Sequence, residues 1–332
     1  MTGATIKKPD FRRMEGAASR IDQAMTATLA PSAATARTEL DAVMLICATT
    51  LKPEPIRWLW LEWLALGKLH IMAGAPGQGK TTINLAFAAT VSAGGRWPDG
   101  SRCEPGNVLI WSGEDDPADT LLPRLVAMGA NPERVFFVGG ARINGESLAF
   151  DPARDMAQLI VAAKGIGGCR LLIVDPVVSA VTGDSHKNTE VRRALQPLVD
   201  LGASLDCAVV GISHFSKGSG GRDPTERVVG SVAFGAVARV VMVAAKVKAD
   251  EEGKERRVLA RSKSNIGPDS GGFDYDIDQI ELDAYPGIFA SRVHGAQLSR
   301  VRRANCWPRP TMTPAQMTVN QKTMSTSSCA NC

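Results

Sequence analysis

The residues best suited to phosphate chemistry form a glycine-rich segment, GAPGQGKT, at positions 74–81. It fits the pattern G-x4-G-K-S/T at every fixed position, the pattern of a P-loop. The glycines let backbone N–H groups turn inward around phosphate oxygens, and a following helix adds a favourable dipole. We expect nucleotide contacts from Gly74, Ala75, Pro76, Gly77, Gln78, Gly79, Lys80, Thr81 and Thr82.

Two carboxylates follow at positions suited to metal binding and to hydrolysis. Asp175 ends the apolar run at 170–174 and lies 95 residues after Lys80, as in a Walker B strand. With the Thr81 hydroxyl, its carboxylate is expected to coordinate the Mg²⁺ that accompanies ATP. Glu114 lies closest to the end of another apolar run, so we favour it as the carboxylate that activates water. The alternative is a solvated turn acid, with Asp115 acting as the base instead.

Alternating strands and helices are predicted around these residues, which favours a parallel sheet covered on both faces. After Arg239 the pattern changes to successive strands, and we expect an antiparallel extension of the sheet. Asp-Pro pairs at 116 and 151 predict helix starts. The predicted strands are 69–72, 107–112, 134–138, 170–174, 208–213, 239–245, 257–264, 272–282 and 288–293, and the predicted helices are 80–92, 116–125 and one containing 156–163.

The chain has 332 residues, 44% of them hydrophobic and 22% charged, as in an ordinary globular protein. No apolar run approaches the roughly 18 residues of a membrane helix. The start of the sequence offers no secretory signal, so we expect a cytoplasmic protein without a membrane partner. We divide the chain into a mobile arm (1–50), an ATPase domain (51–294) and an unstructured basic tail (295–332).

The net charge of +4 comes from the tail. The tail holds five basic residues and no acid, so the remaining 33 basic and 34 acidic residues give a net charge of −1. Any DNA contact must therefore come from a local patch. The tail also holds three of the seven cysteines, and a zinc site built from His294, Cys306, Cys329 and Cys332 is an alternative to an incidental tail.

The order of the segments GAPGQGKTT, WSGEDD, LLIVDP and GISHFSKG resembles the RecA-like P-loop ATPases of the RepA-type hexameric replicative helicases, common in plasmids and prophages. The resemblance spans residues 57–282. It implies an α/β fold with a RecA-like P-loop NTPase core and a mostly parallel sheet. It also implies ATP and Mg²⁺ as ligands, a homo-oligomeric hexameric ring, and single-stranded DNA as a partner.

The resemblance also assigns roles to individual residues. Lys80, Thr81, Glu114 and Asp175 match the family's phosphate, metal and catalytic residues. His214 matches a polar sensor of the γ-phosphate, and Arg239 matches an arginine finger that enters the neighbouring subunit's ATP site. A lysine–arginine hairpin has its counterpart near Lys263, although Asn265 stands where the family has arginine.

In the family, the loop that follows the sensor faces the central channel and touches DNA. Here the corresponding segment carries Lys217, Arg222 and Arg227, which could follow a phosphate backbone without reading bases. A solvated linker is the alternative interpretation.

Two questions remain open at the level of sequence. Trp58, Trp60 and Trp63 could wall an adenine pocket, but a buried aromatic patch at the sheet edge is favoured. A DNA-directed motor is the favoured function, with a loader or regulatory ATPase that unwinds nothing as its rival. A small-molecule kinase fits less well because no lid with convergent arginines is recognised.

Overall fold

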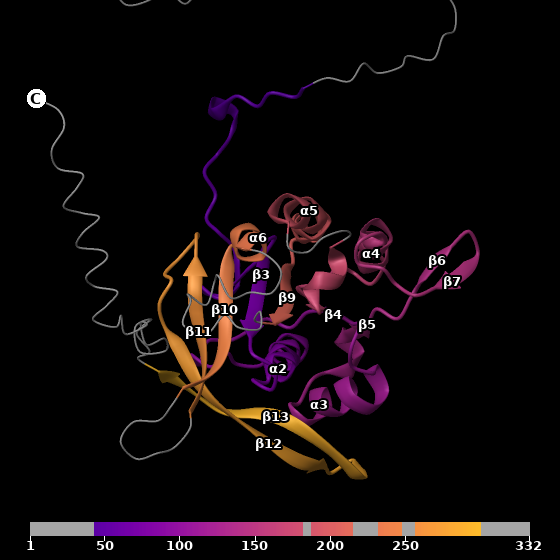
Figure 1. Ribbon diagram of the computed structural model, residues 1–332, viewed down its shortest axis with the longest axis vertical. Helices are drawn as coiled ribbons and strands as arrows, with labels where there is room; N and C mark the ends of the chain where they lie inside the picture. The colour runs from indigo at the N-terminus through magenta and orange to yellow at the C-terminus, as the bar shows by residue number, and fades with distance from the viewer. Residues whose placement is uncertain (1–42, 182–186, 215–231, 248–255, 300–332) are drawn as a thin grey trace, which may run out of the picture. The chain divides into compact units, whose positions relative to one another are not determined.

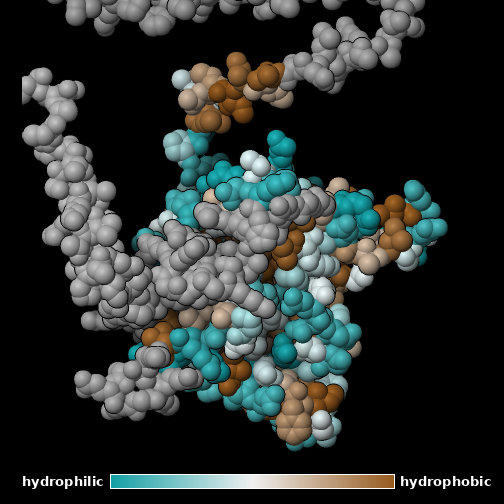
Figure 2. All heavy atoms as spheres, viewed as in Figure 1, coloured by the Kyte–Doolittle hydropathy of each residue, from teal (hydrophilic) through white to brown (hydrophobic). Residues whose placement is uncertain are grey.

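The computed structural model describes residues 43–181, 187–214, 232–247 and 256–299. The chain divides into two compact units after Glu54, four residues beyond the predicted end of the arm. In the described part of the first unit, η1 (Ala48–Thr50) is a single 3₁₀ turn. The large apolar side chains of this part, which is coloured brown in Figure 2, are 61–91% exposed: Val43, Met44, Leu45, Ile46 and Leu51.

The second unit is built on a nine-stranded sheet of order β13-β12-β11-β10-β3-β9-β8-β4-β5 (Figure 1). The strands from β10 to β5 in this order are parallel, and β11, β12 and β13 extend the sheet in antiparallel fashion. The predicted fold class is therefore confirmed. The nine strands are β3 (Leu69–Gly74), β4 (Val108–Ser112), β5 (Val135–Phe137), β8 (Leu171–Asp175), β9 (Ala208–His214), β10 (Val240–Val247), β11 (Arg256–Ser264), β12 (Gly272–Leu282) and β13 (Tyr285–Ser299).

Helices cover both faces of this sheet (Figure 1). Successive residues of β3 point to opposite faces: Met72 packs with α2 and α3, while Ile71 packs with α4, α5 and α6. Because both faces are buried, the parallel strands are mostly apolar, with buried polar side chains such as His70 of β3 as exceptions. The helices are α2 (Lys80–Ala93), α3 (Leu122–Ala127), α4 (Met156–Gly165), α5 (Asn188–Leu205) and α6 (Val232–Val237).

Short elements complete the described part of the chain. Two small antiparallel hairpins, β1 with β2 and β6 with β7, lie outside the main sheet. No helix among the described residues is long and apolar enough to cross a membrane. The remaining elements are β1 (Trp58–Trp60), β2 (Leu64–Ala65), β6 (Ala141–Ile143), β7 (Glu146–Leu148), η2 (Pro117–Leu121), η3 (Pro132–Arg134) and η4 (Val177–Ala180).

One predicted helix start is confirmed and the other is wrong. Asp116 caps η2, because its carboxylate accepts the N–H groups of Ala118 and Asp119 at 2.7 and 3.1 Å. The carboxylate of Asp151 instead accepts the N–H of Ala153 and closes a turn. The helix after it therefore begins only at Met156, where Asp155 is the residue before the first turn.

The C-terminal strand is longer than predicted. β13 pairs with β12 as far as Gly272 opposite Ser299, so the ladder includes the first five residues, 295–299, of the predicted tail. The ladder continues because β12 still offers Phe273 and Asp274 as backbone partners for Leu298 and Gln297.

The tryptophan cluster is a buried aromatic patch, as favoured from the sequence. Trp60 is 1% exposed and stacks on Trp63 and on Trp97, with ring centroids 4.8 and 4.9 Å apart. Its indole N–H donates to the Asp99 carboxylate at 2.9 Å. Phe273 of β12 also contacts the stack, which thereby joins the first hairpin of the unit to the antiparallel extension.

We expect Trp60→Ala to lower the free energy of unfolding by about 3–5 kcal/mol, because it removes a fully buried ring from this stack. Leu61→Ala is the matched control, since the Leu61 side chain is 62% exposed. Urea unfolding followed by circular dichroism would measure both. Equal stability of the two variants would contradict a structural role for the stack.

Candidate active site

The predicted site residues converge because four neighbouring parallel strands end at one edge of the sheet. β3, β9, β8 and β4 lie side by side in that order. Gly74, the first residue of the P-loop, pairs with His214, and Asp175 pairs with Ser112, two residues before Glu114. Carboxyl ends of parallel strands are where α/β sheets bind ligands.

The P-loop itself depends on glycine at two positions. Gly77 and Gly79 have φ angles of 74° and 76°, which residues other than glycine rarely adopt. A Cβ at Gly79 would also lie 2.2 Å from the Ile277 side chain on β12. Gly79 precedes α2, so the helix N-terminus and its free N–H groups face the loop.

Lys80, the first residue of α2, is buried beside this loop. Its ammonium donates to the Ala75 carbonyl and to Nδ1 of His214, both at 3.1 Å. Burial lowers the pKa of Lys80, and the negative charges of Asp175 and Glu114 oppose that shift. An ammonium can only donate, so Nδ1 of His214 accepts and the ring proton belongs to Nε2.

Thr81 and Asp175 fit a magnesium site. The Thr81 hydroxyl donates to the Asp175 carboxylate at 2.7 Å, and Asp175 is 4% exposed. Burial raises the pKa of Asp175 to about 6, and the nearby charges of Glu114 and Asp115 add to the effect. A hydroxyl and a desolvated carboxylate, which no cation of the described chain engages, are oxygen donors of the kind Mg²⁺ prefers.

Three consecutive acids after β4 have different surroundings. Asp115 forms an ion pair with Arg124 of α3 at 3.1 Å, and Asp116 caps η2. Glu114 is exposed, and among the described residues no ion pair engages its carboxylate. Its charge nevertheless acts on Lys80, Asp175 and His214. Glu114 is thus the acid of this segment that remains available to a ligand.

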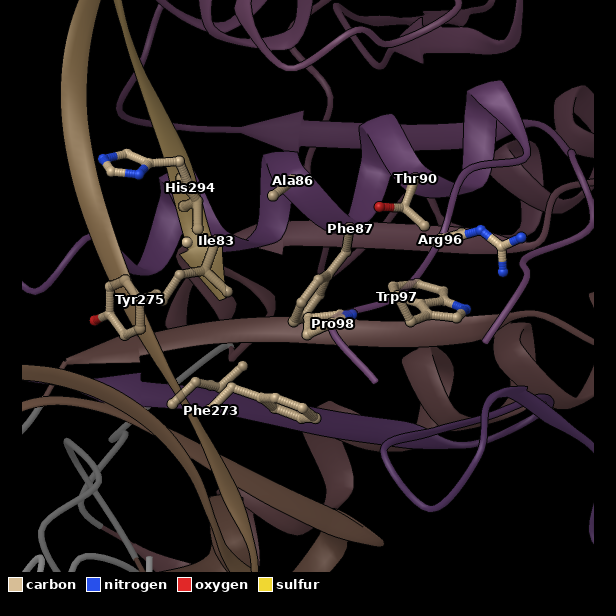
Figure 3. A pocket seen from close by; sticks show the side chains of 13 residues that line it. Ile83, Ala86, Phe87, Thr90, Arg96, Trp97, Pro98, Phe273, Tyr275 and His294 are labelled. Carbon is tan, nitrogen blue, oxygen red and sulfur yellow. The ribbon is translucent and has the colours of Figure 1, made fainter. Parts of the chain in front are cut away.

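Two residues near the P-loop were not predicted from the sequence. The Tyr275 hydroxyl on β12 donates to the Gln78 carbonyl at 2.7 Å, and Ile277 packs against Gly79. Tyr275 also lines a cavity of about 270 Å³ between α2 and the β12–β13 hairpin (Figure 3). The cavity lies beside α2, and Trp97 lines it, whereas Trp58, Trp60 and Trp63 do not. Tyr275 lies about 200 residues from the loop in sequence, so only the folded hairpin reveals the contact.

A family model described as an AAA domain matches residues 34–220, more than half of the chain. The chain belongs to this AAA domain family. No curated protein matches the sequence. Among solved structures, a KaiC-like protein from Pyrococcus horikoshii is 16% identical, with a TM-score of 0.47; the match covers 71% of this chain and 99% of that one.

The matched AAA domain contains the P-loop, Glu114, Asp175 and His214 and supports a nucleotide-hydrolysing activity. Arg239 lies outside it, at the amino end of β10, on the edge of the sheet opposite the P-loop. Lys263 lies beside it on β11. The structure therefore does not bring these two cations to the chain's own phosphate site.

Other predicted residues are separate from the site or lie outside the described residues. The predicted DNA-contacting residues Lys217, Arg222 and Arg227 lie outside the described residues. So do three members of the predicted zinc site, Cys306, Cys329 and Cys332. The remaining residue of that hypothesis, His294, faces Asp278, with 3.7 Å between Nε2 and the carboxylate. Within the described ranges no cluster of three potential metal ligands occurs.

The raised pKa of Asp175 predicts a stability effect with a definite sign. The folded chain holds this proton more tightly than the unfolded chain, so stability falls as pH rises from about 4 to about 6. Above pH 6 the buried charge costs about 3 kcal/mol. Without metal, Asp175→Asn should therefore be more stable than wild type at pH 8, with a smaller gain at pH 5.

Urea unfolding at the two pH values would measure this, with the exposed Asp283→Asn as control. The variant should also lose the stabilisation that Mg²⁺ with ATP gives the wild type. If Asp175→Asn were less stable than the wild type at pH 8, the Asp175 carboxylate could not be an uncompensated buried charge.

The Tyr275 contact predicts an effect on nucleotide affinity. Tyr275→Phe leaves the Gln78 carbonyl without its partner, at a cost of about 1–1.5 kcal/mol. We expect ATP to bind roughly 5- to 10-fold more weakly. Tyr285→Phe is the control, because Tyr285 is the other tyrosine of the chain and is 53% exposed. Titration with a fluorescent ATP analogue would compare them, and equal affinities would show that the loop does not need this contact.

Proposed function

We propose that this AAA-family chain is a cytoplasmic, ring-forming motor that hydrolyses ATP and acts on DNA, as a replicative helicase of plasmid or prophage replication does. The observation that carries the proposal is the convergence of Lys80, Thr81, Glu114, Asp175 and His214 at the ends of four adjacent strands. The buried cysteines of the described chain are free thiols, as is usual in reducing compartments.

ATP hydrolysis at this site would use the described residues in distinct roles. The P-loop N–H groups and Lys80 bind the phosphates. Thr81 and Asp175 would hold Mg²⁺, which supplies charge neutralisation at the phosphates when bound. Glu114, exposed and unpaired among the described residues, accepts the proton of the attacking water. His214 reports the state of the γ-phosphate through its bond to Lys80 and through Nε2–H, for which no acceptor is found among the described residues.

The position of Arg239 supports assembly into a homo-oligomer, and the resemblance suggests six subunits. Arg239 lies at the edge of the sheet opposite its own P-loop, so it can reach a nucleotide only in another copy. Contacts between opposite edges of identical subunits are heterologous, and they form a ring when the rotation between subunits closes. In such a ring Arg239 would act as an arginine finger.

The DNA part of the proposal is supported by the resemblance and by residue types. Lys217, Arg222 and Arg227 follow the sensor strand directly, so a change at His214 would reach them first. Single-stranded DNA is the expected ligand, bound through its phosphates. The rival is a loader or regulatory ATPase, which would hydrolyse ATP in the same site without displacing a strand.

The role of Glu114 is testable by an isosteric change. Glu114→Gln should bind ATP normally and turn it over roughly 10²-fold more slowly, because the amide cannot accept the proton. Asp119→Asn, an exposed change in η2, is the control. Steady-state turnover and nucleotide titration give the two readouts. Normal turnover by Glu114→Gln would transfer the role of base to Asp115 or another acid.

The DNA-directed function is tested by turnover with and without single-stranded DNA at low salt. With about three loop cations engaged per subunit, the salt slope of DNA binding should be near −2 per subunit. Lys217→Ala should reduce that slope by about one contact and remove DNA stimulation while basal hydrolysis persists. ATPase activity that ignores DNA would overturn the motor, and hydrolysis without strand displacement would favour the loader.

A further inference from the structure

The turn that carries Glu114 is closed by a hydroxyl group at the end of β4. Ser112, the last residue of that strand, accepts the N–H of Asp115 at 2.9 Å and the N–H of Glu114 at 3.3 Å through its Oγ atom. Because β4 ends at Ser112, neither N–H belongs to the sheet ladder. The hydroxyl therefore fixes the backbone at the point where the chain leaves the strand.

Ser112 is itself fixed by the neighbouring strand. It is the register partner of Asp175 in the parallel pair of β4 and β8. The N–H of Gly113 donates to the Asp175 carbonyl at 2.8 Å, and Trp111, on the other side of Ser112, is 8% exposed. The hydroxyl thus joins the turn that carries Glu114 to the strand end that carries Asp175.

The two acids that follow Glu114 are fixed by their side chains, whereas Glu114 is fixed only through its backbone. Asp115 is bonded to Arg124 of α3 at 3.1 Å, and Asp116 accepts two N–H groups of η2. Within the described chain, the bond to Ser112 is the only hydrogen bond of Glu114. The direction of the Glu114 carboxylate therefore depends on the backbone that Ser112 holds.

The rate of hydrolysis should be sensitive to this arrangement. The charge of Glu114 acts on Lys80 and Asp175, so its carboxylate lies near the phosphate site. A base must come within about 2.6–3.2 Å of the water that it deprotonates, and a misplacement of about 1 Å can lower a rate by about 10²-fold. An exposed glutamate already samples several rotamers, and motion of its backbone would widen that distribution.

We propose that Ser112 is a positioning residue for ATP hydrolysis, whose hydroxyl oxygen holds the backbone of Glu114 and so keeps the Glu114 carboxylate beside the strand end of Asp175. This inference rests on the proposed function, in which Glu114 activates water. What the position requires is a hydroxyl acceptor on a strand residue. Threonine supplies both and alanine supplies no acceptor.

The direct test compares Ser112→Ala with Ser112→Thr in the full chain. Ser112→Ala should lower kcat roughly 10- to 100-fold while KM for ATP stays within about twofold, because Lys80 and Thr81 are unchanged. Ser112→Thr should retain most of the activity, since it keeps the acceptor. Ser147→Ala is the control, because it removes an exposed hydroxyl from β7. Wild-type kcat in Ser112→Ala would overturn the proposal.

A double substitution separates positioning from a general effect on the fold. In Glu114→Gln the positioned group can no longer accept a proton, so adding Ser112→Ala should lower the remaining single-turnover rate by less than about twofold. A merely structural role would give the same loss in both backgrounds. Equal losses would therefore overturn the proposal, even where urea unfolding shows that every variant is folded.

The dependence of turnover on Mg²⁺ tests the other neighbour of the hydroxyl, Asp175. Under the proposal, Ser112→Ala and the wild type reach half-maximal turnover at the same Mg²⁺ concentration. A higher Mg²⁺ requirement, with wild-type kcat at saturating Mg²⁺, would overturn the proposal and assign Ser112 to the metal site.

Glu114→Gln alone distinguishes failure of this inference from failure of the proposed function. If Glu114→Gln is slow while Ser112→Ala turns over ATP like the wild type, only the role of Ser112 fails. If Glu114→Gln itself turns over ATP like the wild type, the proposed base fails, and the positioning role of Ser112 fails with it.

Discussion

Asp175 is buried at the end of β8, where its carboxylate accepts the Thr81 hydroxyl and, within the part of the chain that the structure describes, bonds no cation. The Thr81 hydroxyl and the charges of Lys80, Glu114 and Asp115 all act on that carboxylate. The sheet must place apolar strands on both sides of β8, and the desolvation they cause gives the carboxylate its raised pKa. Lys80 lies near enough to reduce the cost without neutralising it. The negative charge of Asp175 is only partly compensated. Binding a divalent ion together with a phosphate would therefore stabilise this site most.

Much of this arrangement could be predicted from the sequence, because the informative signals are local. GAPGQGKT fixes a loop between a strand and a helix, and an apolar run ending in Asp175 fixes a strand end. Parallel strands then bring such ends together without any knowledge of side-chain contacts. The features that the sequence did not predict depend either on long-range contacts or on the exact geometry of a turn. The Tyr275 contact needs the folded hairpin, and Asp151 closed a turn although its Asp-Pro sequence matched that of a helix start.

The antiparallel extension lies outside the matched AAA domain, yet it contacts the P-loop of that domain. Tyr275 and Ile277 reach Gln78 and Gly79 from β12. The same strand contributes Phe273 to the aromatic stack, and β13 packs against α2 and α3. The P-loop backbone is therefore positioned by the parallel core, through β3 and α2, and by the antiparallel extension, through β12.

The indole stack has an optical consequence. The Trp60 and Trp97 rings are parallel at 4.9 Å, and the Trp63 ring is tilted by 15° at 4.8 Å. Chromophores this close share their excited states, so their absorption and ellipticity depend on the angle between them. Phe87 of α2 packs edge-on against two of these rings, and α2 begins at the P-loop. A rotation of α2 would therefore change the near-ultraviolet circular dichroism spectrum of the unlabelled chain.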